Sequence, residues 1–160
     1  MIANAIIISY HCCVTSDTKP AEVEIRAWAR LVRASQDVIG AIENDLKITG
    51  FPSLHWYDVL LELDGAKDGA LRPSELAERT LFERYSITRL VDRMEKHGLV
   101  ERIPCPEDAR GAIVSITAKG RTLRRDMWPA YSAAIKKRFA DRLDDGDAEQ
   151  LARLLQKLKN

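Results

Sequence analysis

The chain has 160 residues, of which 46% are hydrophobic and 31% are charged, and its formal net charge is +1. This length suits one domain or one subunit of a compact dimer, and the apolar content is enough for a core and does not indicate disorder. The small net charge argues against a simple polybasic binder, so the placement of the charges matters more than their sum.

The charges are distributed unevenly along the chain. Residues 72–125 contain 12 Lys/Arg and 8 Asp/Glu, which is a net charge of +4, whereas residues 1–71 contain 6 and 10, a net charge of −4. The last 35 residues contain 7 and 6, a net charge of +1. Contact with nucleic-acid phosphates requires such a local excess of cations. A bias of this size also arises by chance.

Residues 1–20 are expected to form an N-terminal extension. Their apolar run is not preceded by Lys or Arg, has no clear small-residue cleavage site and is too short to span a bilayer, so no targeting or membrane segment is predicted. Cys12, Cys13 and Cys105 make no disulfide framework, and their spacing does not suit zinc. We therefore expect a cytoplasmic bacterial protein without metal or cofactor.

A first helix is predicted for about residues 21–48. Thr18, Pro20 and Glu22 mark its start, and Gly50 and Pro52 mark its end. Apolar positions recur at steps of three and four, which predicts a seam for packing against other helices. The seam consists of Ile25, Trp28, Val32, Ser35, Ile39, Ile42 and Leu46.

Three shorter helices are predicted next. The first follows Ser53 and ends before Gly65, after which residues 67–69 form a turn. The second opens at Arg72-Pro73, because proline suits the first turn of a helix. The third spans about residues 84–97 and ends at Gly98, a residue type favoured just after a helix.

The helix over residues 84–97 divides into two faces. At 100° per residue, Ile87, Leu90, Val91 and Met94 cluster within about 100°, which predicts that they face the core. Polar and basic residues on the other side suit base edges and phosphates, although an ordinary solvated helix has the same pattern. The candidate DNA contacts here and on the preceding helix are Arg72, Ser74, Arg84, Tyr85, Ser86, Thr88, Arg89 and Arg93.

Two strands, at residues 99–103 and 112–116, are predicted around a charged tip. Thr117 then caps a long helix, in which Pro129 predicts a kink. One of the acids of Asp144-Asp145-Gly146-Asp147 caps the last helix. The apolar candidates for a core shared with a second subunit are Trp128, Tyr131, Phe139, Leu151, Leu154, Leu155 and Leu158.

The segment ITRLVDRMEKHGLVER and the tip Asp108-Ala109-Arg110 resemble the winged helix-turn-helix of the MarR family, and the resemblance extends more weakly over about residues 21–158. It implies a mainly α fold with a small β-hairpin wing (α+β). It places the DNA-binding domain at 52–117 and the dimerisation helices at 21–51 and 118–160. It also implies that Arg110 enters a minor groove while Asp108 orients the wing; otherwise Asp108 only forms the turn.

The family resemblance implies a homodimer. A dimer is also expected on physical grounds, because one recognition helix contacts only a few base pairs, whereas two helices related by a two-fold axis can read a palindrome. The alternative is that the last two helices fold back on their own subunit. Many family members also bind small aromatic acids or phenols, and the candidate ligand residues here are Trp28, His55, Trp56 and Asp58. A Trp on an apolar stripe is otherwise a core residue.

The sequence therefore predicts a DNA-binding transcriptional regulator. It would be a repressor that binds a palindromic operator as a homodimer and is modulated by a small aromatic carboxylate or phenol. One alternative is redox control through Cys12 or Cys13, and another is a winged helix that binds only protein. The chain has no nucleophile elbow, phosphate loop, HExxH or paired-carboxylate motif, so an enzyme is not predicted.

Overall fold

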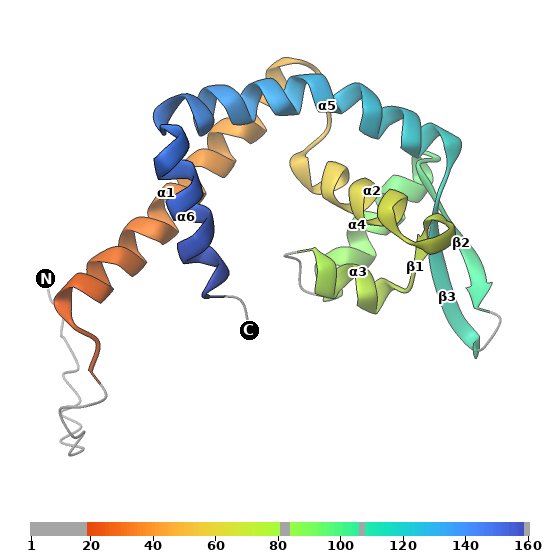
Figure 1. The fold of residues 1–160 in the computed structure, drawn as a ribbon. Helices are drawn as coiled ribbons and strands as arrows, with labels where there is room; N and C mark the ends of the chain where they lie inside the picture. Colours follow the sequence, from red (N-terminus) through yellow and green to blue (C-terminus); the bar gives the residue numbers. More distant parts are fainter. Residues whose placement is uncertain (1–18, 81–83, 106–107, 159–160) are drawn as a thin grey trace, which may run out of the picture. The chain divides into compact units, whose positions relative to one another are not determined.

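A computed structural model describes residues 19–80, 84–105 and 108–158. The chain divides into two compact units, residues 1–36 and 37–160, each of which is described by itself. The described part of the first unit is essentially the first half of α1 (Glu22–Ile48). After the end of α1, the second unit contains α2 (Leu54–Gly65), η1 (Lys67–Gly69), β1 (Ala70–Leu71), α3 (Pro73–Arg79), α4 (Arg84–Lys96), β2 (Val100–Cys105), β3 (Asp108–Ile116), α5 (Ala118–Arg138), η2 (Ala140–Arg142) and α6 (Asp145–Gln156) (Figure 1).

The capping residues seen in the sequence set the ends of these helices. The Thr117 hydroxyl oxygen accepts a hydrogen bond of 3.1 Å from the amide of Gly120 at the start of α5. Asp144 accepts one of 2.7 Å from the amide of Asp147 at the start of α6. Gly98 follows α4 with a φ of +68°, a conformation that favours glycine. The predicted helix boundaries are thus confirmed to within a residue or two.

The sheet contains one strand more than predicted. The described strands are antiparallel in the order β1-β3-β2, and Ala70 and Leu71 pair with Ser115 and Val114. The expectation of two strands alone was wrong, because a strand of two residues is too short to show alternation. Pro104 lies in β2, next to an irregularity in the pairing with β3. A proline is tolerated there because β2 is an edge strand.

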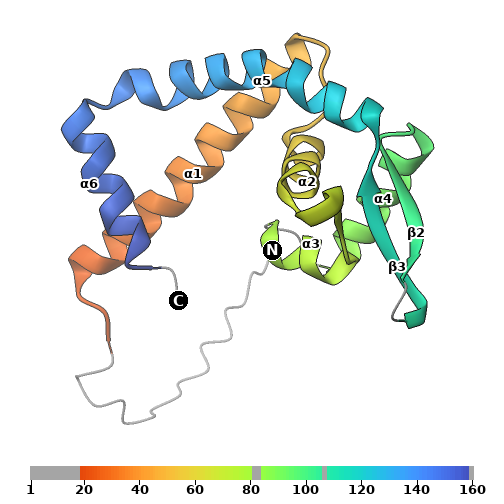
Figure 2. The ribbon, with the colours of Figure 1, turned by 45° about the vertical axis from the view of Figure 1, so that its right-hand side comes forward.

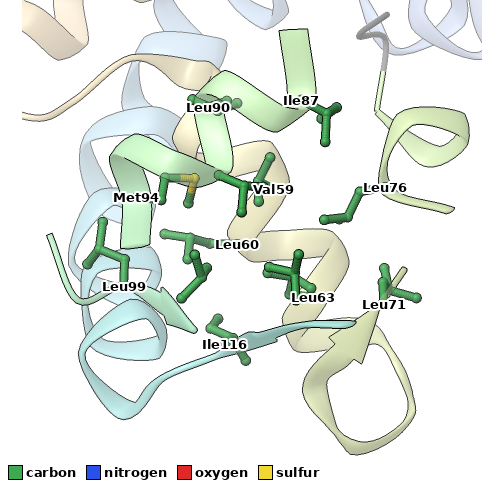
Figure 3. Packing of buried hydrophobic residues seen from close by; sticks show 13 residues of the cluster. Val59, Leu60, Leu63, Leu71, Leu76, Ile87, Leu90, Met94, Leu99 and Ile116 are labelled. Atoms are coloured by element: carbon green, nitrogen blue, oxygen red, sulfur yellow. The ribbon is translucent and has the colours of Figure 1, made fainter. Parts of the chain in front are cut away.

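The winged-helix core lies among α2, α4 and the sheet, and these elements are side by side in Figure 2. In Figure 3, Met94 of α4 points toward Leu60 of α2, with Leu99 and Ile116 completing the layer. Leu60, Leu63, Leu76, Ile87 and Met94 are each 0% exposed. This core fixes the position of α4 relative to the β2–β3 hairpin.

A second apolar cluster joins the end of α1 to α2 and α5. Ile42, Leu46, Tyr57 and Met127 are buried in it. At its edge Arg138 of α5 donates two hydrogen bonds, of 2.6 and 2.7 Å, to the carboxylate of Asp45 on α1. These bonds hold the pKa of Asp45 below its ordinary value of 3.8.

A second ion-pair cluster joins α5 to α2. Asp64 of α2 pairs with Arg121 and, at 2.6 Å, with Arg124. A Cβ atom added at Gly120 would collide with the carbonyl oxygen of Leu99, so the first turn of α5 lies directly against the connection between α4 and β2. The helix α5 is thus attached to α2 and to the α4–β2 connection near its start, and to α1 at its end.

The predicted seam of the first helix has two different environments. Ile42 and Leu46 are buried, whereas Ile25 and Trp28 are 48% and 67% exposed. The helix α6 has no buried residue, and Leu154 on it and Leu158 just after it are exposed. Within the described residues, these are large apolar surfaces that this chain leaves uncovered.

Two further predictions concern the long helices. The helix α5 continues through Pro129, and the kink there stays a prediction. None of the described helices combines the length and the apolar character needed to cross a membrane.

We expect Asp45→Asn to destabilise the protein at neutral pH and to have little effect in acid. Because the folded-state pKa of Asp45 is lowered, its contribution to stability is complete above the unfolded value of 3.8 and is lost as the pH falls through the folded value. Melting temperatures measured between pH 7 and about pH 2.5 test this. The matched control is Asp37→Asn, an exposed acid on the same helix; equal curves for the two variants would contradict the prediction.

Candidate nucleic-acid interface

The helix α4 presents one buried face and one open face. Ile87, Leu90, Val91 and Met94 are 0–4% exposed, as predicted for the core side. On the opposite side Arg89, Arg93 and Lys96 are exposed, and at 100° per residue they fall within about 60° of one another. We call these three residues the cationic stripe. A row of cations on an open helix face suits the phosphate backbone of a nucleic acid.

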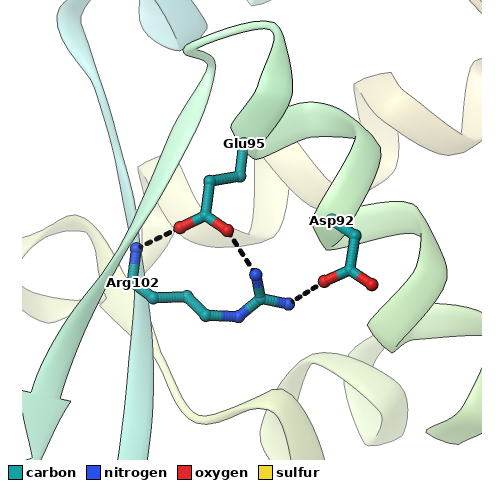
Figure 4. A network of polar contacts seen from close by, with 3 residues as sticks. All are labelled: Asp92, Glu95 and Arg102. Carbon is teal, nitrogen blue, oxygen red and sulfur yellow. Dashed lines mark hydrogen bonds and ion pairs between the residues drawn. The ribbon is translucent and has the colours of Figure 1, made fainter.

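Arg102 of β2 binds two acidic residues of α4 (Figure 4). Its guanidinium pairs with Asp92 at 2.5 Å and also pairs with Glu95. The carboxylate of Glu95 accepts a further hydrogen bond of 3.0 Å from the backbone amide of Arg102. We call this network the Arg102 clamp. It attaches the first strand of the hairpin to the helix that carries the cationic stripe.

The Arg102 clamp also changes the electrostatics of α4. Asp92 lies beside the cationic stripe, where a bare carboxylate would repel phosphate and weaken the local positive potential. The pairing with Arg102 offsets part of the negative charge of Asp92 and Glu95 and holds the Asp92 carboxylate toward β2. Sequence reasoning did not single out Arg102, because the contact joins residues 10 positions apart on two different elements.

The remaining predicted DNA contacts occupy α3, α4 and β3. Arg72 and Ser74 are half-buried at the start of α3, where the amide of Arg72 donates to the Glu75 carboxylate at 2.7 Å. Thr88 is exposed on α4. For five of them only the backbone is described. These are Arg84, Tyr85 and Ser86 in the first turn of α4, and Asp108 and Arg110 in β3.

The predicted ligand residues do not share one face of α2. Trp56 packs edge-on against His97, which follows α4, with ring centroids 5.2 Å apart. Asp58 is two residues further along, about 200° around the helix. Trp28 belongs to the first unit, where its side chain is exposed. His55 is exposed, and its Nδ1 lies 3.1 Å from Glu43 of α1.

Asp58 lies close to an aromatic cluster. Tyr57 contacts Trp128 and Tyr131 of α5, with ring centroids 6.3 and 4.8 Å away. Burial raises the pKa of Asp58 above its ordinary value, with an opposing effect from His55. Burial and the charge of Asp58 likewise raise the pKa of Tyr131. Asp58 and Tyr131 are thus partly buried polar groups at the edge of the aromatic cluster.

The structure describes only part of what was predicted for the cysteines and for metal binding. Cys12 and Cys13, on which the redox alternative depends, lie outside the described residues. Cys105 is buried as a free thiol. Among the residues that the structure describes, no group of three His, Cys, Asp or Glu side chains is placed to hold a metal ion.

Known proteins resemble this chain in sequence. The model of the MarR family matches residues 49–111. The HTH-type transcriptional regulator PrsX of Escherichia coli is 36% identical over 80 residues, which are 50% of this chain and 48% of PrsX. The HTH-type transcriptional repressor YetL of Bacillus subtilis is 29% identical over 105 residues, 64% of this chain and 63% of YetL. The matches therefore span about half to just under two thirds of these relatives.

Solved structures resemble the fold over more of the chain. AbsC, a MarR family transcriptional regulator from Streptomyces coelicolor, has a TM-score of 0.76 at 26% identity, covering 88% of this chain and 94% of AbsC. Another MarR family regulator from S. coelicolor, solved in complex with DNA, has a TM-score of 0.78 at 24% identity, covering 88% and 91%. The mainly α architecture with a small sheet is thus that of MarR-type winged helices.

We expect Arg102→Met to lower the free energy of unfolding by about 1 kcal/mol, since its partners are partly exposed and solvent screens the pairing. The loss should shrink at about 1 M salt, where the Debye length is short. Urea unfolding measures both effects. Arg93→Met is the matched control, because it removes an exposed arginine outside the clamp; an equal loss in both variants would show that the clamp adds no stability.

Proposed function

We propose that the chain is a DNA-binding transcriptional regulator of the MarR family, whose model matches residues 49–111. In this proposal the protein is a repressor in the bacterial cytoplasm that binds a palindromic operator as a homodimer. The observation that carries the proposal is the cationic stripe on α4, with the neighbouring acids bound by Arg102 of the hairpin. The names of PrsX and YetL, a regulator and a repressor, agree with it.

The proposed reading mode follows from the elements that carry the charges. The open face of α4 would lie in the major groove, where Arg89 and Arg93 reach phosphates or guanine edges. The hairpin would lie beside it, with Arg110 directed to a minor groove. Arg72 and Ser74 at the start of α3 would contact the backbone. Because the core packs α4 rigidly against the sheet, helix and hairpin would approach the duplex together.

Support for the homodimer comes from the uncovered apolar surfaces. Trp28 on α1 is 67% exposed and Leu158, just after α6, is 68% exposed. Ile25 lies three positions before Trp28 on α1, and Leu154 and Leu155 precede Leu158, and all three are exposed as well. Grouped apolar side chains, unlike scattered ones, mark a surface for a protein partner. A second copy of the chain is the partner that a palindromic operator requires.

The effector is proposed as a small aromatic carboxylate or phenol, with Trp28, His55, Trp56 and Asp58 as the candidate contacts. Support within the chain comes from Asp58 and the aromatic cluster beside it. DNA binding by BpsR of Bordetella bronchiseptica, which shares the fold at 20% identity, is regulated by 6-hydroxynicotinic acid. At this identity the similarity to BpsR shows only a shared fold. The effector proposed for this chain therefore depends on the four candidate residues named above.

Arg89→Ala should weaken operator binding and lower the slope of log affinity against log salt by about 1, because one phosphate contact is lost. Fluorescence anisotropy with a labelled palindromic duplex, repeated over a salt series, measures both quantities. Arg142→Ala removes an exposed arginine of η2 and is expected to leave them unchanged. If the slope of log affinity against log salt is the same for Arg89→Ala and the unmodified protein, Arg89 does not contact phosphate. If the unmodified protein does not bind duplex DNA, the proposed function is wrong.

Arg110→Ala should reduce operator affinity by roughly 1–3 kcal/mol, the usual range for losing one specific contact. The loss should be larger on operators with A·T-rich flanks, because a narrow minor groove concentrates negative potential. Arg110→Lys keeps the charge and should recover part of the affinity, while melting curves confirm folding. Unchanged affinity of Arg110→Ala on both kinds of flank would place the hairpin outside the groove.

A further inference from the structure

Glu95 is an acid in the last turn of α4, directly before Lys96 of the cationic stripe. A carboxylate at this place repels phosphate, so its charge by itself lowers the affinity for DNA. The Arg102 clamp offsets this charge only in part, because one guanidinium faces two carboxylates. Any benefit of Glu95 to the interface therefore comes from the contacts of its two oxygens.

The two oxygens of Glu95 bind different parts of Arg102 (Figure 4). One accepts a hydrogen bond of 3.0 Å from the backbone amide, and the other accepts from the guanidinium. Asp92 instead binds the guanidinium, at 2.5 Å. The guanidinium is at the end of a long, flexible side chain, whereas the amide is part of the strand itself. Of the two acids, Glu95 is therefore the one that holds the backbone of β2.

The amide of Arg102 lies on the outer edge of β2. Arg102 is opposite Val114, and alternate residues of an antiparallel pair direct their amides away from the partner strand. The amide of Arg102 is one of these, because it is bound by Glu95 of the helix. The next outward position is Pro104, which has no amide hydrogen. Beyond Arg102, this edge therefore has no amide that can attach β2 to α4 before the irregular pairing at Pro104 and Cys105.

The winged-helix core holds the base of β2. Val100 is the buried residue of this strand in the core, whereas none of residues 101–104 is buried. From Arg102 to Cys105 the strand extends about 10 Å further. A rotation of β2 at Arg102 therefore displaces the far end of the hairpin more than its base.

We propose that Glu95 is a positioning residue for DNA binding. It fixes the angle between α4 and the β2–β3 hairpin, so that the open face of α4 and the hairpin reach one duplex together. Its charge opposes the phosphates, and its hydrogen bond to the Arg102 amide more than offsets that cost. This role rests on the proposed function, because it concerns how the hairpin meets DNA.

Two substitutions of Glu95 remove the same charge but differ in their hydrogen bonds. Glu95→Gln keeps an oxygen that can accept from the Arg102 amide, whereas Glu95→Met has none. With the full chain and the labelled palindromic duplex, Glu95→Met should bind roughly threefold or more weakly than Glu95→Gln, and also more weakly than the unmodified protein. If Glu95 acts only through its charge, both variants bind more tightly than the unmodified protein. Equal affinities of the two variants overturn the proposal.

A charge control and a backbone measurement accompany the affinities. Glu101→Gln removes the same charge from an exposed position of β2 and should not weaken binding; a loss equal to that of Glu95→Met contradicts the positioning role. In hydrogen exchange followed by NMR, the Arg102 amide should exchange faster in Glu95→Met than in Glu95→Gln. The Thr117 amide, which donates to the Leu99 carbonyl at 3.1 Å, should exchange equally in both. Urea unfolding establishes that each variant is folded under the binding conditions.

A double-mutant cycle tests whether Glu95 acts through the hairpin. Glu95→Met should reduce the preference for A·T-rich flanks, and in an Arg110→Ala background it should cause little further loss of affinity. Losses that simply add would show that Glu95 does not act through the hairpin, which overturns the proposal.

The outcomes separate the role of Glu95 from the proposed function. If the unmodified protein does not bind duplex DNA, the proposed function fails and the positioning role fails with it. If the unmodified protein binds its operator while Glu95→Met and Glu95→Gln bind alike, the proposed function stands and only the role of Glu95 fails. Equal exchange of the Arg102 amide in these two variants also overturns the role, whether or not the protein binds DNA.

Discussion

The guanidinium of Arg102 resolves a conflict within α4. This helix must present cations on its open side, yet Asp92 and Glu95 lie on the same element and would oppose an anionic partner. Arg102 binds both carboxylates from the adjacent strand, and its amide binds Glu95 again. The same contacts attach the hairpin to the helix, so one side chain serves both the electrostatics and the geometry of the interface.

Two further groups of ion pairs converge on α5. Asp64 of α2 and Asp45 of α1 are bound by arginines of α5, near the start and at the end of that helix. Burial of Leu60, Met94 and their neighbours supplies most of the stability, whereas these partly exposed pairs mainly fix the orientation of the helices. The helix α5 is thereby attached to both α2 and the end of α1.

Local signals predicted most of the fold. Thr117, Asp144 and Gly98 mark helix ends because capping depends on adjacent residues. The strand β1 was not predicted, because two residues are too few to show the alternation of apolar and polar positions. The Arg102 clamp was not predicted, because it joins two elements that come together only in the folded chain. The opposite placement of Trp56 and Asp58 was predictable at 100° per residue. The wing tip stays a prediction, since the side chains of Asp108 and Arg110 are not described.

The position of Pro104 has a consequence for solubility. β2 is an edge strand, and an edge with free amide and carbonyl groups can recruit a strand from another molecule and start aggregation. Pro104 has no amide hydrogen, and the irregular pairing beside it disturbs the regular spacing that a new strand would need. Pro104 therefore makes the β2 edge of the hairpin a poorer template for a strand from another molecule.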